Sequence, residues 1–327
     1  MHTNSIALCT FNGEKHLSEQ LESYLWQTRL PDELIVCDDN SRDSTLSILQ
    51  AFKKRAPFEV RILENERTLG VKQNFDKAVH HCGKSIIHLS DQDDVWMPMK
   101  IEQVSEAFSG NPDIGLAITD ALITDENLIP LGKTIWQEFE LTPCRRRRMN
   151  NDKLNDEMIR NHVMNGMVLS FRGTFKDIVL PIPKAARSHD SWLMLILSFI
   201  SKFALIPDKL VKYRRHSSTV TKVGETTLKD MTDSIMRSNR RVRSLESRAN
   251  VYLAAIERLE NRYGQSGVEA KIAKARCASN HYVRRSKMPS EHLLRPPFVM
   301  FELVTGSYQR FAPSVWRAIV RDLVEPF

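Results

Sequence analysis

The sequence has few cysteines, and their spacing excludes two classes of small, cross-linked protein. The five residues are odd in number, widely separated and never arranged as CxxC; they are Cys9, Cys37, Cys82, Cys144 and Cys277. Disulfide scaffolds and zinc sites both depend on closely paired cysteines. We therefore expect neither a disulfide framework nor a structural zinc ion, and a reducing cytoplasm as the setting.

Long apolar runs are also missing. The most apolar stretch, residues 192–207, is interrupted by Ser198, Ser201 and Lys202. It is shorter than the roughly 20 apolar residues that cross a bilayer, so a buried helix followed by a buried strand is the better interpretation. The segment after Met1 shows no basic region followed by an apolar one. We expect no signal peptide and a cytoplasmic location.

The positive charge is confined to one part of the chain. Residues 1–224 hold 29 Lys and Arg against 29 Asp and Glu, whereas residues 225–327 hold 18 against 11. The second part also shows charge-rich helical patterns over residues 226–262 and 268–287. We predict a first domain over residues 1–224 and a basic, mainly helical subdomain over residues 225–327. This subdomain either simply packs on the core or meets an anionic membrane surface or an assembly protein.

Strands and helices alternate along the first 118 residues. Short apolar runs at residues 5–9, 34–37, 60–63, 85–89 and 114–118 predict strands, and helical spacing of apolar residues lies between them. Such alternation predicts an α/β fold with a mostly parallel sheet, helices on both faces and ligands at the carboxyl ends of the strands. Residues 142–153, with four consecutive arginines from Arg145, predict an exposed loop; a phosphorylated or lipid-linked acceptor is an alternative use for it.

Polar clusters follow the predicted strands. Residues 10–13 (TFNG) come after the first, residues 38–45 (DDNSRDST) after the second and residues 91–94 (DQDD) after the fourth. Helix capping explains one Asx or Ser in the second cluster, and the others suit a nucleobase and a ribose. Three carboxylates in four residues repel one another unless they are solvated or share a cation. Hard oxygen ligands of this kind suit Mg²⁺ or Mn²⁺, and a solvated acidic turn is the alternative.

Together these motifs resemble the inverting glycosyltransferases of family 2, which have the GT-A fold, and in particular their rhamnosyltransferase-like bacterial branch. The three clusters match T-[FY]-N-G, D-D-x-S-x-D-x-T and S-D-Q-D-D-x-W. Farther on, residues 165–166 (NG) before an apolar strand, 189–192 (HDSW) and 213–216 (YRRH) resemble later elements of the family in the same order. The segment 215–218 departs from the branch, which more often has glycine after the histidine.

The resemblance implies a role for each motif. It implies a nucleotide site at Thr10, Asn12 and Asp39, to which we add Lys72 and Asp91. It implies a divalent metal, Mg²⁺ or Mn²⁺, and we assign to it Asp93, Asp94 and His216. Asp190 resembles the general base, which removes a proton from the attacking hydroxyl.

The implied reaction moves rhamnose or a hexose from a dTDP- or UDP-sugar to a glycan or lipid-linked glycan acceptor of a bacterial surface polysaccharide, such as O-antigen or capsule. We expect no nucleic-acid partner, and peripheral contact with the inner face of the cell membrane. Two alternatives stay open. A scaffold of a polysaccharide assembly complex would bind sugar nucleotides without catalysis, and a phosphohydrolase would use residues 91–95 (DQDDV) as a D-x-D-x-[TV] motif.

Overall fold

A computed structural model describes residues 2–149, 164–216, 234–264, 267–312 and 314–324. The described chain divides into two compact units. The first holds the elements from β1 to β9, and the second holds those from α10 to α14 together with Pro183–Arg187. The predicted boundary between residues 224 and 225 lies outside the described residues and stays a prediction.

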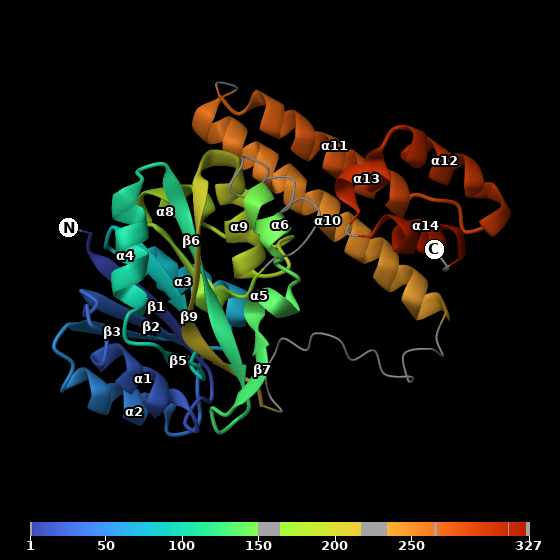
Figure 1. The fold of residues 1–327 in the computed structure, drawn as a ribbon. Coiled ribbons are helices and arrows are strands. Elements are labelled where there is room, and N and C mark those ends of the chain that lie inside the picture. The colour runs from blue at the N-terminus through green and yellow to red at the C-terminus, as the bar shows by residue number, and fades with distance from the viewer. Residues whose placement is uncertain (1, 150–163, 217–233, 265–266, 313, 325–327) are drawn as a thin grey trace. The chain divides into compact units, whose positions relative to one another are not determined.

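The first unit is built on a mixed sheet (Figure 1). Its strands run in the order β3-β2-β1-β4-β8-β6-β9-β5, with β7 on β6. The strands are β1 (Asn4–Thr10), β2 (Glu33–Asp38), β3 (Glu59–Glu64), β4 (Ile86–Ser90), β5 (Val95–Trp96), β6 (Ile114–Thr124), β7 (Pro130–Thr134), β8 (Leu169–Arg172) and β9 (Lys202–Arg214).

Helices cover both faces of the sheet. Helices α1, α2 and α4 lie on the near face in Figure 1, and α3 and α9 pack together on the far face. The larger helices are α1 (Leu17–Leu25), α2 (Thr45–Lys53), α3 (Val71–His81), α4 (Lys100–Gly110) and α9 (His189–Ile200); shorter ones are α5 (Ile135–Glu138), α6 (Pro143–Arg148) and α8 (Lys176–Val179). The predicted α/β fold with a mostly parallel sheet is confirmed.

The burial of the strands follows their place in the sheet. Every residue of β1, β2 and β4 is buried, as expected for parallel strands with helices on both sides. Strand β3 at the sheet edge is mostly exposed or half-buried, and only Val60 is buried. Strand β8, which follows Asn165 and Gly166 as expected, runs antiparallel between β4 and β6.

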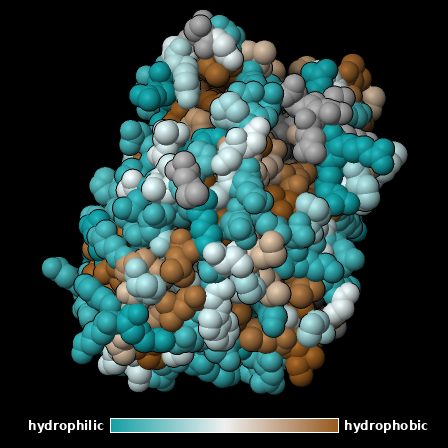
Figure 2. All heavy atoms as spheres, turned by 60° about the vertical axis from the view of Figure 1, so that its left-hand side comes forward, coloured by the Kyte–Doolittle hydropathy of each residue, from teal (hydrophilic) through white to brown (hydrophobic). Residues whose placement is uncertain are grey.

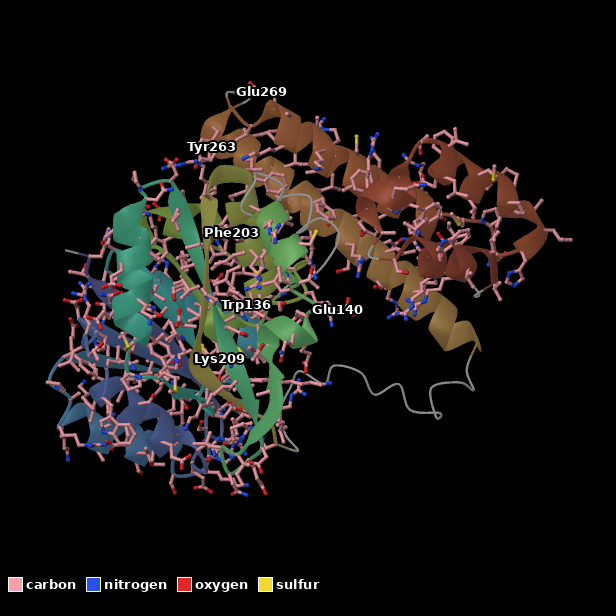
Figure 3. All side chains as sticks on the ribbon, in the orientation of Figure 1. Trp136, Glu140, Phe203, Lys209, Tyr263 and Glu269 are labelled. Atoms are coloured by element: carbon pink, nitrogen blue, oxygen red, sulfur yellow. The ribbon has the colours of Figure 1, made fainter. Side chains whose placement is uncertain are left out.

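One segment differs from its prediction. Residues 142–153 were expected to form an exposed loop, but residues 143–148 form helix α6. Thr142 caps this helix by accepting a hydrogen bond from the Arg145 N–H, 3.3 Å away, and Pro143 suits the first turn. The Arg146 guanidinium stacks 5.1 Å from the centre of the Trp136 ring, which Figure 3 labels. Residues 150–153 lie outside the described part.

The second unit is helical, which confirms the predicted C-terminal helical extension. Tyr263 and Glu269 mark the end of the first long helix and the start of the second (Figure 3). Three short helices follow and pack around Met288, Val299, Tyr308 and Ile319. The helices are α10 (Ser234–Tyr263), α11 (Glu269–Ser286), α12 (Pro296–Val304), α13 (Ser307–Phe311) and α14 (Val315–Val324), with the 3₁₀ turn η5 (His292–Leu294).

No helix of the described residues is both long enough and apolar enough to cross a lipid bilayer.

Candidate functional site

Three of the polar clusters meet at one edge of the sheet. Strands β1, β2 and β4 are parallel neighbours, with Thr10 beside Asp38 and Leu8 beside Ser90. The loops that follow them therefore leave the sheet together, which is where α/β folds bind ligands.

The first two loops hold each other in place. The Thr10 hydroxyl donates to Asp38 Oδ1 over 2.7 Å, and the Asn12 N–H donates to Ser41 Oγ over 2.9 Å. In return Asn12 Oδ1 accepts from the Arg42 N–H at 2.9 Å. Asn12 has a φ of 48°, in the left-handed region that asparagine tolerates better than most residues. Thr10 and Asn12 thus join the first two loops, and their place in a nucleotide site stays a prediction.

Asp39 fixes the approach to helix α3. Its Oδ1 accepts the N–H of Leu69 at 2.7 Å and the side-chain amide of Asn65 at 2.9 Å, and its Oδ2 accepts the N–H of Gly70 at 2.8 Å. Lys72 lies two residues farther on, in the first turn of α3, where partial burial lowers its pKa. Asp39 therefore holds the start of α3, and with it Lys72, near the carboxyl ends of the strands. A contact between Asp39 and the nucleobase of the donor stays a prediction.

Gln92 joins the acidic run to the first loop. Its Oε1 accepts the Phe11 N–H at 2.8 Å, and its Nε2 donates to the Phe11 carbonyl at 3.0 Å. The amide thus satisfies both backbone groups of one residue. A Cβ on Gly13 would lie only 2.3 Å from Gln92 Oε1, so this fit requires glycine there.

Asp93 and His216 meet although 123 positions separate them in the sequence. His216 Nε2 lies 2.8 Å from Asp93 Oδ2, and both side chains are partly exposed. Arg214 fixes the strand end that carries this histidine. Its N–H donates to Asp94 Oδ1 over 3.0 Å and its Nε donates to the Asp93 carbonyl over 2.8 Å.

The other two carboxylates of the acidic run, Asp91 and Asp94, have raised pKa values. Asp94 is fully buried, and burial followed by the charges of Asp93 and Asp91 raises its pKa well above the ordinary value. Burial, then Asp93 and Asp190, raises the pKa of Asp91 to about 7. Lys100 is fully buried near these two carboxylates. Its Nζ donates to the Met167 carbonyl at 2.7 Å. Burial lowers the pKa of Lys100 to about 7.

Asp190 lies in the first turn of α9, with only 8% of its surface exposed. Its Oδ1 accepts the Ser191 N–H at 2.6 Å, and the helix N-terminus favours the negative charge. Its charge contributes to the raised pKa of Asp91, so the two carboxylates lie within electrostatic reach. The preceding His189 stacks on Phe75 with ring centres 3.8 Å apart, which fixes the start of the helix.

Asp93 and His216 fit a divalent cation whose remaining ligands are substrate oxygens and water. Within the described chain, no group of three His, Cys, Asp or Glu side chains is arranged to hold a metal alone. Mg²⁺ is commonly held by only one or two protein ligands together with phosphate oxygens and water. The 2.8 Å separation of Asp93 Oδ2 and His216 Nε2 is close to the ~3 Å between adjacent ligands of an octahedral ion. Asp94, enclosed and bonded to Arg214, is less open to an ion, and its assignment as a ligand stays a prediction.

Sequence reasoning named Asp93, His216 and Asp190 but missed three residues that hold the site. Gln92 and Arg214 lie inside the motifs, yet the motifs do not say what their side chains contact. Lys100 gave no signal beyond being a lysine between the strands predicted at residues 85–89 and 114–118.

Comparison with known proteins shows which family the chain resembles. A family model described as Glycosyl transferase family 2 matches residues 5–171. The uncharacterized protein Rv1520 of Mycobacterium tuberculosis is 25% identical over 216 residues, which cover 65% of this chain and 59% of that protein. The chain thus matches about three fifths of this relative's length.

Two further proteins have more informative names. The UDP-Glc:alpha-D-GlcNAc-diphosphoundecaprenol beta-1,3-glucosyltransferase WfgD of Escherichia coli is 32% identical over 109 residues, or 33% of this chain and 42% of that protein. The mannosyltransferase PcManGT of Pyrobaculum calidifontis, solved with GDP-Man and Mn²⁺, is similar in fold. Its TM-score is 0.50 at 14% identity, and the match covers 99% of this chain and 85% of that one.

Proposed function

The chain belongs to glycosyltransferase family 2, and from this premise we propose that it is an inverting glycosyltransferase acting on a nucleoside-diphosphate sugar. The observation that carries the proposal is the pairing of His216 with Asp93 at 2.8 Å, beside the nucleotide-side loops. The neighbouring Asp91 lies within electrostatic reach of both Asp93 and Asp190. A site for a metal diphosphate and a separate carboxylate base is what this reaction needs.

Asp190 is the proposed general base. An inverting transfer requires a group that takes the proton of the acceptor hydroxyl while its oxygen attacks the anomeric carbon. The carboxylate of Asp190 is fixed by the Ser191 N–H, and the stacked His189 holds its helix start. Asp190 is therefore positioned before the acceptor arrives.

Asp93 and His216 are the proposed protein ligands of Mg²⁺ or Mn²⁺. A bound ion of this kind neutralises negative charge on the diphosphate as it leaves. PcManGT, solved with Mn²⁺, supports a divalent metal in this fold. Around it, Gln92 keeps the first loop in register and Arg214 keeps His216 beside Asp93.

Thr10, Asn12, Asp39, Lys72 and Asp91 are the proposed nucleotide side of the site. The donor we propose is dTDP-rhamnose or a UDP-hexose, and the name of WfgD supports a UDP-sugar. The acceptor we propose is a hydroxyl of a surface-polysaccharide glycan, free or linked to a lipid diphosphate as in that name. An anionic membrane or an assembly protein is the proposed partner of the basic C-terminal third.

A donor panel tests the proposal. The protein is incubated with dTDP-rhamnose, UDP-glucose and related donors, together with polyprenyl-diphosphate sugars, and released nucleoside diphosphate is measured with Mn²⁺ or with EDTA. We expect release from one donor that EDTA suppresses and that Asp190→Asn abolishes. Release of inorganic phosphate from phosphomonoesters without nucleoside diphosphate would instead identify a phosphohydrolase. Binding without turnover of any donor would identify a scaffold.

A further inference from the structure

Exposed hydrophobic side chains are concentrated at the end of the second unit. Among the described residues, eighteen large hydrophobic side chains are exposed, and nine of them lie between residues 293 and 324. The face of the protein in Figure 2 is mostly hydrophilic, with hydrophobic residues in separate patches. Such a concentration marks an interaction surface more often than chance exposure does.

Helix α12 presents an apolar stripe to solvent. Pro297, Met300, Phe301 and Val304 are all exposed and follow the i, i+3, i+4, i+7 spacing of one helix face. The opposite face packs on the unit's own core through Val299, which is only 3% exposed. The exposed stripe is therefore not part of the core that holds the second unit together.

A groove runs beside this stripe. It has a volume of about 330 Å³ and lies between α11 and α12; its lining is Arg284, Met288, Pro297, Phe298, Phe301 and Glu302. The Arg284 guanidinium stacks 5.4 Å from the centre of the Phe301 ring, so a cation stands at the margin of the apolar surface.

Helix α14 repeats the pattern. Its exposed side chains are Trp316, Val320 and Val324, with Arg317 and Arg321 beside them. An exposed tryptophan among aliphatic and basic residues is typical of helices that lie in a membrane interface.

The charges around these helices are segregated by sign. The carboxylate of Asp322 is fully buried and accepts the Arg285 Nε at 2.6 Å, and that of Glu302 is buried against His281 and Arg284. Among the described residues from 287 to 324, the exposed charges are mainly basic: Lys287, Arg310, Arg317 and Arg321, against Glu291. The surface that solvent meets is thus apolar and positive.

We propose that the exposed faces of α12 and α14 dock the protein on an anionic membrane surface. Apolar side chains enter the boundary between headgroups and acyl chains while the arginines pair with anionic lipid, and both contributions are needed for stable binding. A second copy of the chain is a poorer occupant, because a two-fold contact would place these basic groups opposite themselves. The inference rests on the proposed function in one respect: a lipid-linked acceptor lies in the membrane, so docking would bring the protein to it.

Vesicle sedimentation tests the inference without any donor or acceptor, so its failure is separate from failure of the transferase assay. The full chain is spun with phosphatidylcholine vesicles that contain either no anionic lipid or about 30% phosphatidylglycerol. We expect pelleting with the anionic vesicles alone, weakened by high salt. The double variant Met300→Asp, Val304→Asp should lose at least about tenfold in binding, and Arg317→Glu should lose a smaller factor.

The matched control is Ile129→Asp with Leu131→Asp, two exposed apolar residues of the first unit at 60% and 51% exposure. This control should pellet as wild type does, and circular dichroism should show all variants folded. Wild-type protein that stays in the supernatant with both vesicles would overturn the inference. The inference would also be overturned if the Met300→Asp, Val304→Asp variant pelleted as wild type does. The same holds if its only change were the loss of a dimer, measured by light scattering.

Discussion

At the residue scale, the site depends on side chains that hold motifs together as much as on those that meet substrate. His216 and Asp93 follow the ends of β9 and β4 and lie 2.8 Å apart, and Arg214 joins the same two segments by donating to the Asp93 carbonyl. Gln92 does the same for the first loop through Phe11. Rigid support of this kind keeps reactive groups within the tolerance that catalysis requires.

Gln92→Ala should weaken donor binding about tenfold while the protein stays folded, because two hydrogen bonds that fix the first loop are lost. Gln92→Glu keeps the acceptor for the Phe11 N–H but cannot donate to the Phe11 carbonyl, and it adds a charge beside Asp91 and Asp93. The Gln92→Glu variant should therefore bind the donor at least as weakly as Gln92→Ala does. Nucleoside diphosphate titrations measure both.

Gln50→Ala, at an exposed position of α2, serves as the control and should bind as wild type does. Normal donor affinity in Gln92→Ala would show that the first loop needs no such support.

At the element scale, the start of α9 is defined by its fit against Gly166. A Cβ at this position would stand 2.6 Å from His189 Nε2, and His189 is itself stacked on Phe75. Gly166→Ala should therefore push the imidazole, and Asp190 with it, out of place. We expect a loss of about 1–3 kcal/mol in unfolding free energy and a larger fall in kcat than in donor affinity.

Gly110→Ala is the matched control, because nothing lies within 4 Å of the added methyl group at the end of α4. Denaturant unfolding should show no loss for this variant. Equal stability and turnover of the two alanine variants would contradict the proposed fit.

A buried histidine links β4 to its neighbours and gives the sheet a pH dependence. His88 Nδ1 lies 2.8 Å from Ser170 Oγ, and Nε2 lies 3.0 Å from Asn4 Oδ1. Burial, and then the charges of Lys100 and Arg29, hold the pKa of His88 well below its ordinary value of 6.5. As pH falls below about 6.5 the unfolded chain takes up a proton that the folded chain does not, so stability falls by up to ~1.4 kcal/mol per pH unit.

Urea unfolding at about pH 7.5 and about pH 5.5 measures this loss. The His88→Gln variant should be less stable at the higher pH but should lose less on acidification. The exposed His80→Gln should behave as wild type. An unchanged pH dependence in His88→Gln would assign the acid sensitivity to other groups.

At the scale of the whole molecule, the sequence predicts the strands and helices, because these depend on the spacing of apolar residues. It does not predict contacts between side chains that are far apart in the sequence. Parallel strands bring their carboxyl ends to one edge, so the meeting of the clusters at residues 10–13, 38–45 and 91–94 could be predicted. Strand β8 could be placed after Gly166, but not its antiparallel position between β4 and β6. Residues 142–153 were predicted as a loop because a run of four arginines carries no helical pattern, and the contact of Arg146 with Trp136 cannot be predicted from that run.

We propose that Asp93 and His216 hold the metal and the diphosphate, while Asp190 takes the proton of the acceptor hydroxyl. Calorimetry of UDP or dTDP binding with and without Mn²⁺ tests it most directly on three variants, Asp93→Ala, Asp190→Asn and the exposed control Asp113→Ala. We predict that Asp190→Asn and the control keep Mn²⁺-dependent binding within about twofold of wild type, whereas Asp93→Ala loses the Mn²⁺ dependence. Unchanged Mn²⁺-dependent binding in Asp93→Ala would contradict the account.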